Sequence, residues 1–314
     1  MKHFLYSLSA VVFFSAVFPH FSNAQGCSDA GFCTMGALRP DQKFSRRIDF
    51  RLRSVEISQY LGMTRFDDFV WVTTAEATFG LNSDNYLHIK VPYQFTSGPL
   101  AQVGGLSDLS FSYTRTLARQ ENWQVSASVG VKVPLSSPTF TSADGLPLPM
   151  YYQPSLGTYD IIAGASWISK KWLLATGIQH AINRTPSQFM WAPWEGHPME
   201  ETVLIYPQSR DLRRGTDVMI RVERSVRLGN KYVSLGLLPI YRFQEDNIRL
   251  PDGREIDVAE TNGLVLTALT GFGYQFSTKM GIKGLVGYRL LQREKNPDGL
   301  SRKIVFSLGY EYRF

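Results

Sequence analysis

Long hydrophobic runs are almost absent from this sequence. The mean hydropathy is −0.14, and only one stretch, Phe4 to Phe18, is apolar over several helical turns. A transmembrane helix needs about 20 consecutive apolar residues. The sequence therefore excludes a bundle of membrane helices, although 44% of its 314 residues are hydrophobic.

Concentrated positive charge is also missing. Charged residues make up 19% of the chain, and the formal net charge is +6. In a soluble protein this balance could indicate nucleic acid as the partner, but the sequence has no basic cluster and no nucleic-acid motif. We therefore expect no nucleic-acid partner, and we place the excess charge in a lumen or at rims that face anionic lipid.

The stretch from Phe4 to Phe18 has the features of a secretory signal peptide. It follows Lys2 and His3, and small residues precede a cleavage site after Ala24. A membrane anchor is the alternative, but the stretch is short for a span and no stop-transfer charges follow it. We predict three parts: a signal peptide (1–24), an N-terminal segment (25–43) and one barrel domain (44–314).

Both cysteines lie in the N-terminal segment. Cys27 and Cys33 flank S-D-A-G-F, and export favours a disulfide that closes this small loop. A metal site is the rival, but the five-residue spacing matches no usual zinc knuckle. The segment could plug the lumen or contact the periplasm, and if it gates the lumen, deleting residues 25–43 should raise conductance. We expect no cofactor and no bound metal.

Segments of alternating polarity recur twelve times after residue 43. Each has about the length that a tilted transmembrane strand needs. Their approximate ranges are 45–59, 67–80, 85–96, 107–118, 122–135, 157–169, 171–183, 215–228, 231–245, 259–276, 279–293 and 301–314.

Short and long connections alternate between these segments. The short ones are 81–84, 119–121, 170, 229–230 and 277–278, and the long ones are 60–66, 97–106, 136–156, 184–214, 246–258 and 294–300. Outer-membrane barrels have short turns at one end and long loops at the other. The pattern predicts an all-β fold: an antiparallel, up-and-down transmembrane β-barrel of about 12 strands in the outer membrane. A soluble sandwich is the alternative.

The last segment, 301–314, shows the alternation most clearly. One face carries six large apolar side chains: Ile304, Phe306, Leu308, Tyr310, Tyr312 and Phe314. In a barrel strand one face contacts lipid and the other a polar lumen. The terminal Phe314 resembles the signature that the outer-membrane assembly machinery reads, so we expect that machinery and outer-membrane lipid as partners.

Polar side chains should collect on the inner face. The predicted solute path comprises Arg51, Arg53, Glu76, His88, Lys90, Lys132, Arg221, Glu223, Arg227, Lys283 and Arg289. Pairing across strands would neutralise most of these charges. Alternatively, an excess of basic groups would favour anions. Twelve strands leave room for a slim channel or for a core filled by side chains.

The longest predicted loop, 184–214, is rich in aromatic residues. Phe189, Trp191, Trp194 and His197 are candidates for capturing a solute at the mouth. The alternative is a loop that packs on its neighbours. The acidic residues near His197 fit no strong metal-binding motif.

Three short motifs resemble a known outer-membrane family. Residues 103–117 read V-G-G-L-S-D-L-S-F-S-Y-T-R-T-L, residues 131–135 read V-K-V-P-L and residues 157–160 read G-T-Y-D. They are similar to motifs of the transporter family named for the meta-pathway of phenol degradation, a relative of the long-chain fatty acid transporters. Ser107 replaces a glycine of that pattern. The resemblance implies uptake of hydrophobic small molecules, and the Ala24-Gln25 site resembles cleavage sites of the Bacteroidetes.

An enzyme is a further alternative, because one family of twelve-stranded outer-membrane phospholipases uses a Ser–His pair near the barrel rim. His180 lies near a predicted strand end, but no serine motif accompanies it. We therefore predict no enzymatic activity. The expected function is passive uptake of small hydrophobic or amphipathic molecules. The alternatives are a basic channel for acidic solutes and a structural, partner-binding barrel with a filled core.

Overall fold

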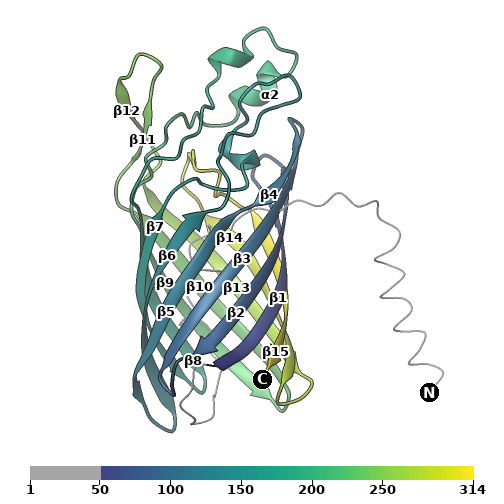
Figure 1. Cartoon of the computed structure of the whole chain (residues 1–314), viewed down its shortest axis with the longest axis vertical. Coiled ribbons are helices and arrows are strands. Elements are labelled where there is room, and N and C mark those ends of the chain that lie inside the picture. Colours follow the sequence, from purple (N-terminus) through teal and green to yellow (C-terminus); the bar gives the residue numbers. More distant parts are fainter. Residues whose placement is uncertain (1–50) are drawn as a thin grey trace, which may run out of the picture.

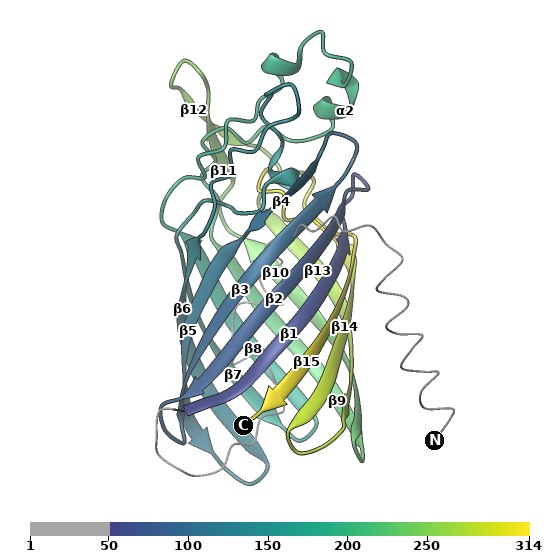
Figure 2. The ribbon, with the colours of Figure 1, turned by 45° about the vertical axis from the view of Figure 1, so that its right-hand side comes forward.

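Residues 51–314 of the chain, described here from a computed structural model, form a closed β-barrel (Figures 1 and 2). Thirteen strands make one sheet in the order β2-β1-β15-β14-β13-β10-β9-β8-β7-β6-β5-β3-β4, and the pairing of β2 with β3 closes it. Strands β4 and β5 lie end to end along β3 and occupy one strand position, so the wall is twelve-stranded. The predicted fold class is confirmed.

All neighbouring strands of the barrel are antiparallel. The strands are β1 (Arg51–Met63), β2 (Phe69–Gly80), β3 (Asn85–Ser97), β4 (Gln102–Leu106), β5 (Asp108–Arg119), β6 (Trp123–Pro134), β7 (Asp160–Ser169), β8 (Trp172–Ala181), β9 (Asp217–Leu228), β10 (Lys231–Arg242), β13 (Gly263–Gln275), β14 (Met280–Leu291) and β15 (Ile304–Arg313). A separate hairpin pairs β11 (Asp246–Arg249) with β12 (Glu255–Val258).

The connections divide the barrel into two ends. We call the end with residues 81–84, 120–122, 170–171, 229–230 and 276–279 the turn end, and the opposite end the loop end. Within residues 51–314, the short helical pieces lie at the loop end: η2 (Met150–Tyr152), η3 (Ala192–Trp194) and α2 (Glu200–Leu204). Within residues 51–314, no helix is long and apolar enough to span a membrane.

Strand β1 extends further than its hydrophobic pattern predicts. Its register with β2 shifts between Leu52 and Ser54, where the sequence predicts a bulge at Ser54. Beyond the bulge the strand continues to Met63 instead of ending at residue 59. Gln59 interrupts the apolar face there, but its side-chain oxygen accepts hydrogen bonds from Trp71 Nε1 (2.6 Å) and Thr73 Oγ1 (2.8 Å). Those bonds satisfy its polar group within the strand.

Two predicted loops contain strands. Residues 97–106 include β4, which pairs with the C-terminal part of β3. Residues 246–258 include the β11–β12 hairpin. The Gly104-Gly105 pair in the first and the charged residues of the second obscure the alternation of polarity on which the prediction rests. The predicted signal peptide, the segment 25–43 and the pairing of Cys27 with Cys33 lie outside the described residues.

Candidate functional site

The inside of the barrel has two unlike walls. Along β2, β3, β5 and β6 the buried inner positions are mainly hydroxyl-bearing: Thr74, Thr78, Ser110, Ser112, Thr114, Ser126 and Ser128. Along β7, β8, β9, β10 and β13 they form an apolar cluster: Ile162, Ala175, Met219, Leu238, Ile240, Val265 and Leu269. We call these residues the polar wall and the apolar wall.

The apolar wall is a feature of the inner face, because alternate residues of the same strands point outward. In β10, Leu238 is 1% exposed, whereas its neighbour Leu237 is 46% exposed. Gly177 leaves space for the Met219 side chain: a Cβ at Gly177 would lie 2.7 Å from Met219 Cε. A strand whose two faces are both apolar shows little alternation, so period-two reasoning does not find this wall.

Charges on the inner side of the polar wall are paired across strands. Lys90 Nζ lies 3.3 Å from Glu76 Oε2, and these residues are directly opposite in β2 and β3. His88 Nδ1 is 3.8 Å from Glu76 Oε1 and 3.1 Å from Thr78 Oγ1. Lys132 Nζ lies 3.1 Å from Asp108 Oδ2. Such pairing neutralises charge that would be costly to bury alone.

Further predicted path residues lie nearer the turn end. Arg221 donates to Glu223 Oε2 (2.6 Å from Nη2) on the same face of β9, and Lys283 Nζ is 2.8 Å from Glu311 Oε2. Arg53 is buried at the β1 bulge, whereas Arg51 and Arg227 are exposed.

Arg289 lies at the loop end, as does Lys132 with its partner Asp108. Arg289 Nη1 donates to Ser301 Oγ at 2.7 Å. The predicted path therefore does not form one cluster but follows the inner face from the turn end to the loop end.

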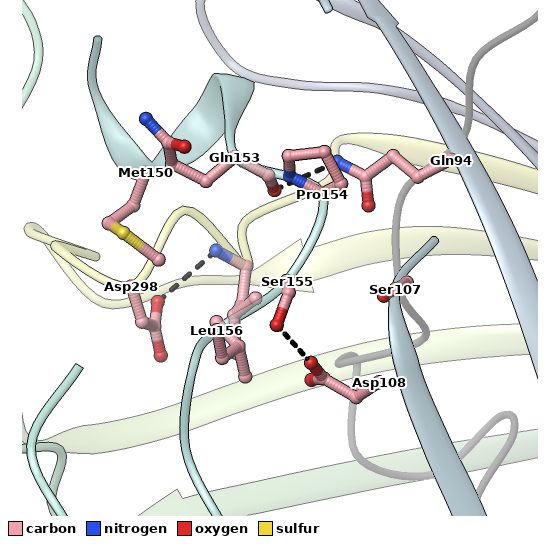
Figure 3. Close-up of a pocket in the computed structure, with 10 residues that line it drawn as sticks. Gln94, Ser107, Asp108, Met150, Gln153, Pro154, Ser155, Leu156 and Asp298 are labelled. Carbon is pink, nitrogen blue, oxygen red and sulfur yellow. Dashed lines mark hydrogen bonds between the residues drawn. The ribbon is translucent and has the colours of Figure 1, made fainter. Parts of the chain in front are cut away.

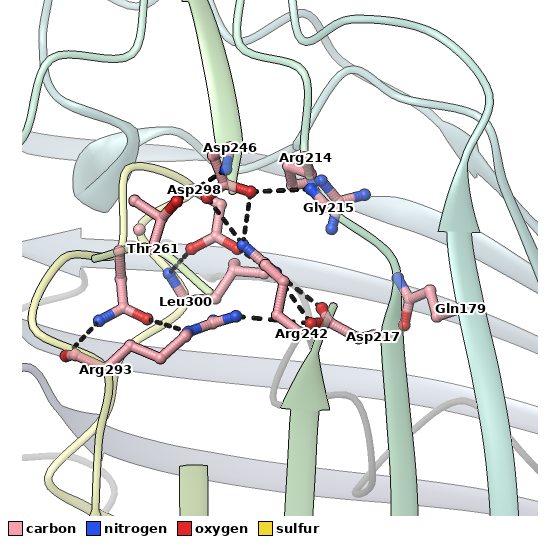
Figure 4. A network of polar contacts seen from close by, with 12 residues as sticks. Gln179, Arg214, Gly215, Asp217, Arg242, Asp246, Thr261, Arg293, Asp298 and Leu300 are labelled. Atoms are coloured by element: carbon pink, nitrogen blue, oxygen red, sulfur yellow. Dashed lines mark hydrogen bonds and ion pairs between the residues drawn. The ribbon is translucent and has the colours of Figure 1, made fainter. Parts of the chain in front are cut away.

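A second charge network, missed by the sequence reasoning, lies at the loop end (Figure 4). Arg242, at the end of β10, is 0% exposed and contacts three carboxylates. Its guanidinium lies 2.6 Å from Asp217, 2.8 Å from Asp246 and 2.8 Å from Asp298. Arg293 Nη1 is 3.4 Å from Asp217 Oδ1. The network thus ties β9 and β10 to the loop at 292–303 and to the start of β11.

The two loop carboxyl groups of this network, Asp246 and Asp298, differ in pKa. Burial raises the pKa of Asp246 to about 6, against the opposing attraction of Arg242. Asp298 is also buried, but Arg242, Arg293 and Arg214 together lower its pKa to about 2. Asp246 accepts further bonds from Gly215 N, at 2.8 Å, and from Arg242 Nη1. Two aspartates of one network therefore have pKa values shifted in opposite directions.

Three long connections close the loop end. We call residues 135–159, 182–216 and 292–303 the loop layer. The first two segments share a buried aromatic core that includes Tyr151, Tyr152, Phe189, Trp194 and Tyr206. The third segment packs on the first through Leu300, which clusters with Met150 and Leu156. Tyr206 contacts Tyr151 and Tyr152 with ring centroids 5.5 Å and 5.9 Å apart. Beneath this layer, Val70 and Val72 of β2 are 0% exposed, so the layer covers the barrel mouth (Figure 1).

The predicted capture residues divide into two groups. Phe189 and Trp194 are 0% and 1% exposed and belong to the core of the loop layer. Trp191 is 39% exposed, and its Nε1 donates to Tyr206 O at 2.8 Å. His197 packs edge-on against Trp194, and its Nε2 lies 3.2 Å from Asp144 Oδ2. The first pair matches the alternative of a loop packed on its neighbours.

A buried carboxylate joins the loop layer to the β1–β2 connection. Asp68 Oδ1 accepts hydrogen bonds from Tyr152 OH (2.6 Å) and Tyr206 OH (2.8 Å), and its Oδ2 accepts one from Thr64 Oγ1 (2.9 Å). Burial raises the pKa of Asp68, although the three hydroxyl donors act in the opposite direction. These bonds connect three segments that are far apart in the sequence.

Figure 3 shows a small cavity beneath the loop layer. Ser107, at the break between β4 and β5, lines it together with Gln94, Ser155 and Leu156. Ser155 Oγ donates to Asp108 Oδ1 at 2.6 Å, and Gln94 Nε2 donates to Gln153 O at 2.9 Å. The break in the strand thus lies where the loop layer enters the barrel.

Sequence comparisons find no match: no family model and no curated protein matches the chain. Structural comparison shows the fold to be similar to the COG4313 outer membrane channel from Pseudomonas putida F1, at TM-score 0.59 and 13% identity, over 88% of this chain and 100% of that one. The NanC porin is also similar, at TM-score 0.46 and 10% identity over 84% and 100% of the two chains. The chain therefore has the fold of an outer-membrane channel barrel.

The prediction that the chain is not an enzyme is corrected, because its structural neighbours include an enzyme. Outer membrane phospholipase A from Escherichia coli is also a structural neighbour, at TM-score 0.38 and 10% identity over 84% of this chain and 98% of that one. The fold by itself shows no enzymatic activity. His180, the histidine considered from the sequence, has Nδ1 2.9 Å from Thr216 Oγ1.

Proposed function

We propose that the protein is an outer-membrane channel for passive entry of small hydrophobic or amphipathic molecules, as the resemblance to the phenol-degradation transporter family implies. In this proposal the turn end faces the periplasm and the loop end faces outward, as in other outer-membrane barrels. Large apolar side chains such as Ile220, Leu235 and Val233 cover the outside of the barrel, which supports its placement in lipid.

The apolar wall is the observation that carries this proposal. A pathway for sugars or salts gains nothing from seven clustered apolar side chains inside the barrel, whereas a solute with an apolar part can pack against them once the interior opens. The opposite, hydroxyl-rich wall offers hydrogen bonds to a polar part of the same solute. The two walls together favour amphipathic molecules.

The position of the loop layer supports capture of a solute at the outer mouth. Entry of the solute then requires the loop layer to move. The aromatic core of the layer is buried, and the layer covers the inner side of β2 at its loop end. A solute would enter when the bonds around Asp68 open, because these bonds connect the layer to the β1–β2 connection.

The test compares two leucines of β10 that differ only in the face they occupy. Leu238→Thr introduces a hydroxyl into the apolar wall, and Leu237→Thr makes the same change on the lipid face. We expect uptake of benzyl alcohol into liposomes to fall about three- to tenfold for Leu238→Thr, as expected for a loss of about 1 kcal/mol of apolar contact, and to stay near wild type for Leu237→Thr. Equal uptake by all three proteins would contradict the proposal.

A filled, structural barrel is the second candidate, because side chains and the loop layer already bury most inner positions. It predicts no benzyl alcohol uptake and no current in planar bilayers from any variant, together with stable co-purification of a periplasmic partner.

A further inference from the structure

The outer surface of the turn end is basic. Exposed basic residues that form no ion pair with any residue in the range 51–314 occupy outward strand positions and turns there: Arg115, Lys170, Lys171, Arg224, Lys231 and Lys279. The acidic residues of this surface are Asp84, which pairs with Arg119, and Glu121. In the adjoining strands, Glu76 and Glu311 are buried on the inner face. The surplus of positive charge therefore lies on the outside of the barrel.

Arg224 is the member of this group whose surroundings the strand register defines best. In β9, Glu223 is 4% exposed and faces the interior, so Arg224 faces outward. It lies directly opposite Trp172 in β8 and directly opposite Leu235 in β10. Leu235 and, on β9 itself, Val226 are exposed on the same outer face. Arg224 is thus a cation that projects from an apolar wall.

Trp172 indicates the depth of this cation in the membrane. It is the first residue of β8, directly after the turn 170–171, and its N–H donates to Ser169 Oγ at 3.0 Å. Tryptophan side chains gather where the membrane core meets the headgroups. The Arg224 guanidinium carbon lies 5.4 Å from the centroid of the Trp172 ring, which is a cation–π contact. The guanidinium therefore lies at headgroup level, where a charge on the outer face is tolerated.

The contact with Trp172 leaves the hydrogen-bond donors of Arg224 available. The ring covers one face of the guanidinium, whereas the N–H groups lie in the guanidinium plane and match two oxygens of a phosphate. Among residues 51–314, none forms an ion pair with Arg224. Lys171 O accepts a hydrogen bond from Ser225 N at 2.8 Å, which holds the basic turn 170–171 beside this part of β9. A phosphate that carries acyl chains can contact the guanidinium and the apolar wall together, whereas free phosphate can contact only the first.

We infer that Arg224 and Trp172 form a binding site for the phosphate group of an anionic phospholipid in the leaflet around the turn end. The inference rests on the proposed function for the placement of the barrel in lipid, and it adds a partner that passage of a solute does not require. In the proposed orientation this leaflet is the periplasmic one. Arg224 supplies the donors, Trp172 holds the guanidinium at headgroup depth, and Leu235 and Val226 contact the acyl chains.

Native mass spectrometry of the full-length refolded barrel in neutral detergent micelles provides the test, because it counts the lipids that stay bound. The two probes, dioleoylphosphatidylglycerol and dioleoylphosphatidylcholine, have the same acyl chains and differ in net charge. Arg224→Gln removes the proposed donors. Arg115→Gln removes the same charge from the outer face at the same end, where Asn85 and Ala127, and no aromatic ring, lie directly opposite. Heat-modifiable electrophoretic mobility confirms that each variant has folded.

We expect Arg224→Gln to weaken phosphatidylglycerol binding about tenfold, since it removes a charge-assisted bidentate contact, and Arg115→Gln to change it less than about twofold. Arg224→Lys keeps the charge but not the planar fork, so its affinity should fall between that of the wild type and that of Arg224→Gln. The wild type should bind phosphatidylglycerol more tightly than phosphatidylcholine, and excess inorganic phosphate should not displace the lipid.

Three results would overturn the inference: equal losses in the two glutamine variants, equal binding of the two lipids to the wild type, or displacement of the lipid by inorganic phosphate. Lipid binding in micelles requires no transport. Retained phosphatidylglycerol binding with failed benzyl alcohol uptake would therefore reject the channel and not the site, and the opposite pair of results would reject the site alone.

Discussion

Arg242 shows how a buried charged side chain depends on its neighbours for compensation of its charge. Three carboxylates surround its buried guanidinium, and a second arginine, Arg293, contacts one of them. Removing one partner of a buried ion pair typically costs about 3–5 kcal/mol, because the remaining charge is left without compensation. Arg242 therefore stabilises the junction between the strands and the loop layer in addition to any effect on solutes.

The pH dependence of stability should report on Asp246. Its pKa is raised from the ordinary 3.8 to about 6, so the folded protein binds a proton at pH values where the unfolded chain does not. The free energy of unfolding should therefore fall as the pH rises from about 4 to about 6, by roughly 1–3 kcal/mol, and then level off. Asp298 has a lowered pKa of about 2 and loses its contribution only below pH 3.8, in a separate window.

Asp246→Asn is the matching variant, because asparagine resembles the protonated acid. Urea unfolding in micelles, followed by tryptophan fluorescence from pH 4 to pH 7, measures the difference between wild type and variant. We expect this difference to change between pH 4 and pH 6 and to stay constant above pH 6. A difference that is constant over the whole range would contradict the assignment.

Among the elements, the loop layer is the one whose position depends most on a few polar contacts. Tyr152 and Tyr206 both donate to the buried Asp68, and both rings belong to the aromatic core of the layer. Their hydroxyl groups couple the packing of the layer to the β1–β2 connection. Loss of the hydroxyls leaves the packing in place and removes the coupling.

The double variant Tyr152→Phe/Tyr206→Phe should open the barrel mouth more often. Hydrogen bonds to a charged group contribute about 1.5–3 kcal/mol each, so losing two should raise the open fraction at least tenfold. Single-channel recording in planar bilayers counts the openings. Tyr241→Phe, which changes an exposed tyrosine on β10, serves as the control. Unchanged opening in the double variant would show that other contacts hold the layer.

At the scale of the whole molecule, we propose that the C-terminal strand takes part in assembly as well as in folding. Phe314 is 62% exposed, its ring centroid lies 5.0 Å from that of Tyr312, and its N–H donates to Arg53 O at 3.0 Å. These few contacts are a small fraction of the contacts that stabilise the barrel wall. We therefore expect Phe314 to contribute little to stability and more to recognition by the assembly machinery.

Deletion of Phe314 should therefore separate the two processes. We expect refolding into micelles to stay within about twofold of wild type, because only one hydrogen bond of about 1 kcal/mol is lost. Assembly in cells, measured as folded barrel in outer-membrane fractions, should fall severalfold, and Phe314→Trp should retain it. Equal assembly of the deleted and wild-type chains would contradict this role.

The sequence by itself determined the twelve strand positions of the barrel wall, their order, and the pairing of each strand with its neighbours in the sequence. The side-chain period of a strand and the length of a turn are local properties, and a barrel built from hairpins places neighbours in sequence beside each other in space. Each of the twelve barrel strands therefore overlaps a predicted segment. The inner position of Lys90 and Lys132 follows from the same period.

Only the tertiary structure decided what each inner and loop residue contacts. The partners of Arg242 come from β9, from β11 and from the loop at 292–303, and Asp68 meets tyrosines 84 and 138 positions away. The burial of Phe189 and Trp194 and the gathering of the apolar wall likewise depend on distant segments. No local period encodes such contacts, because they arise when the closed barrel brings separate strands and loops around one interior.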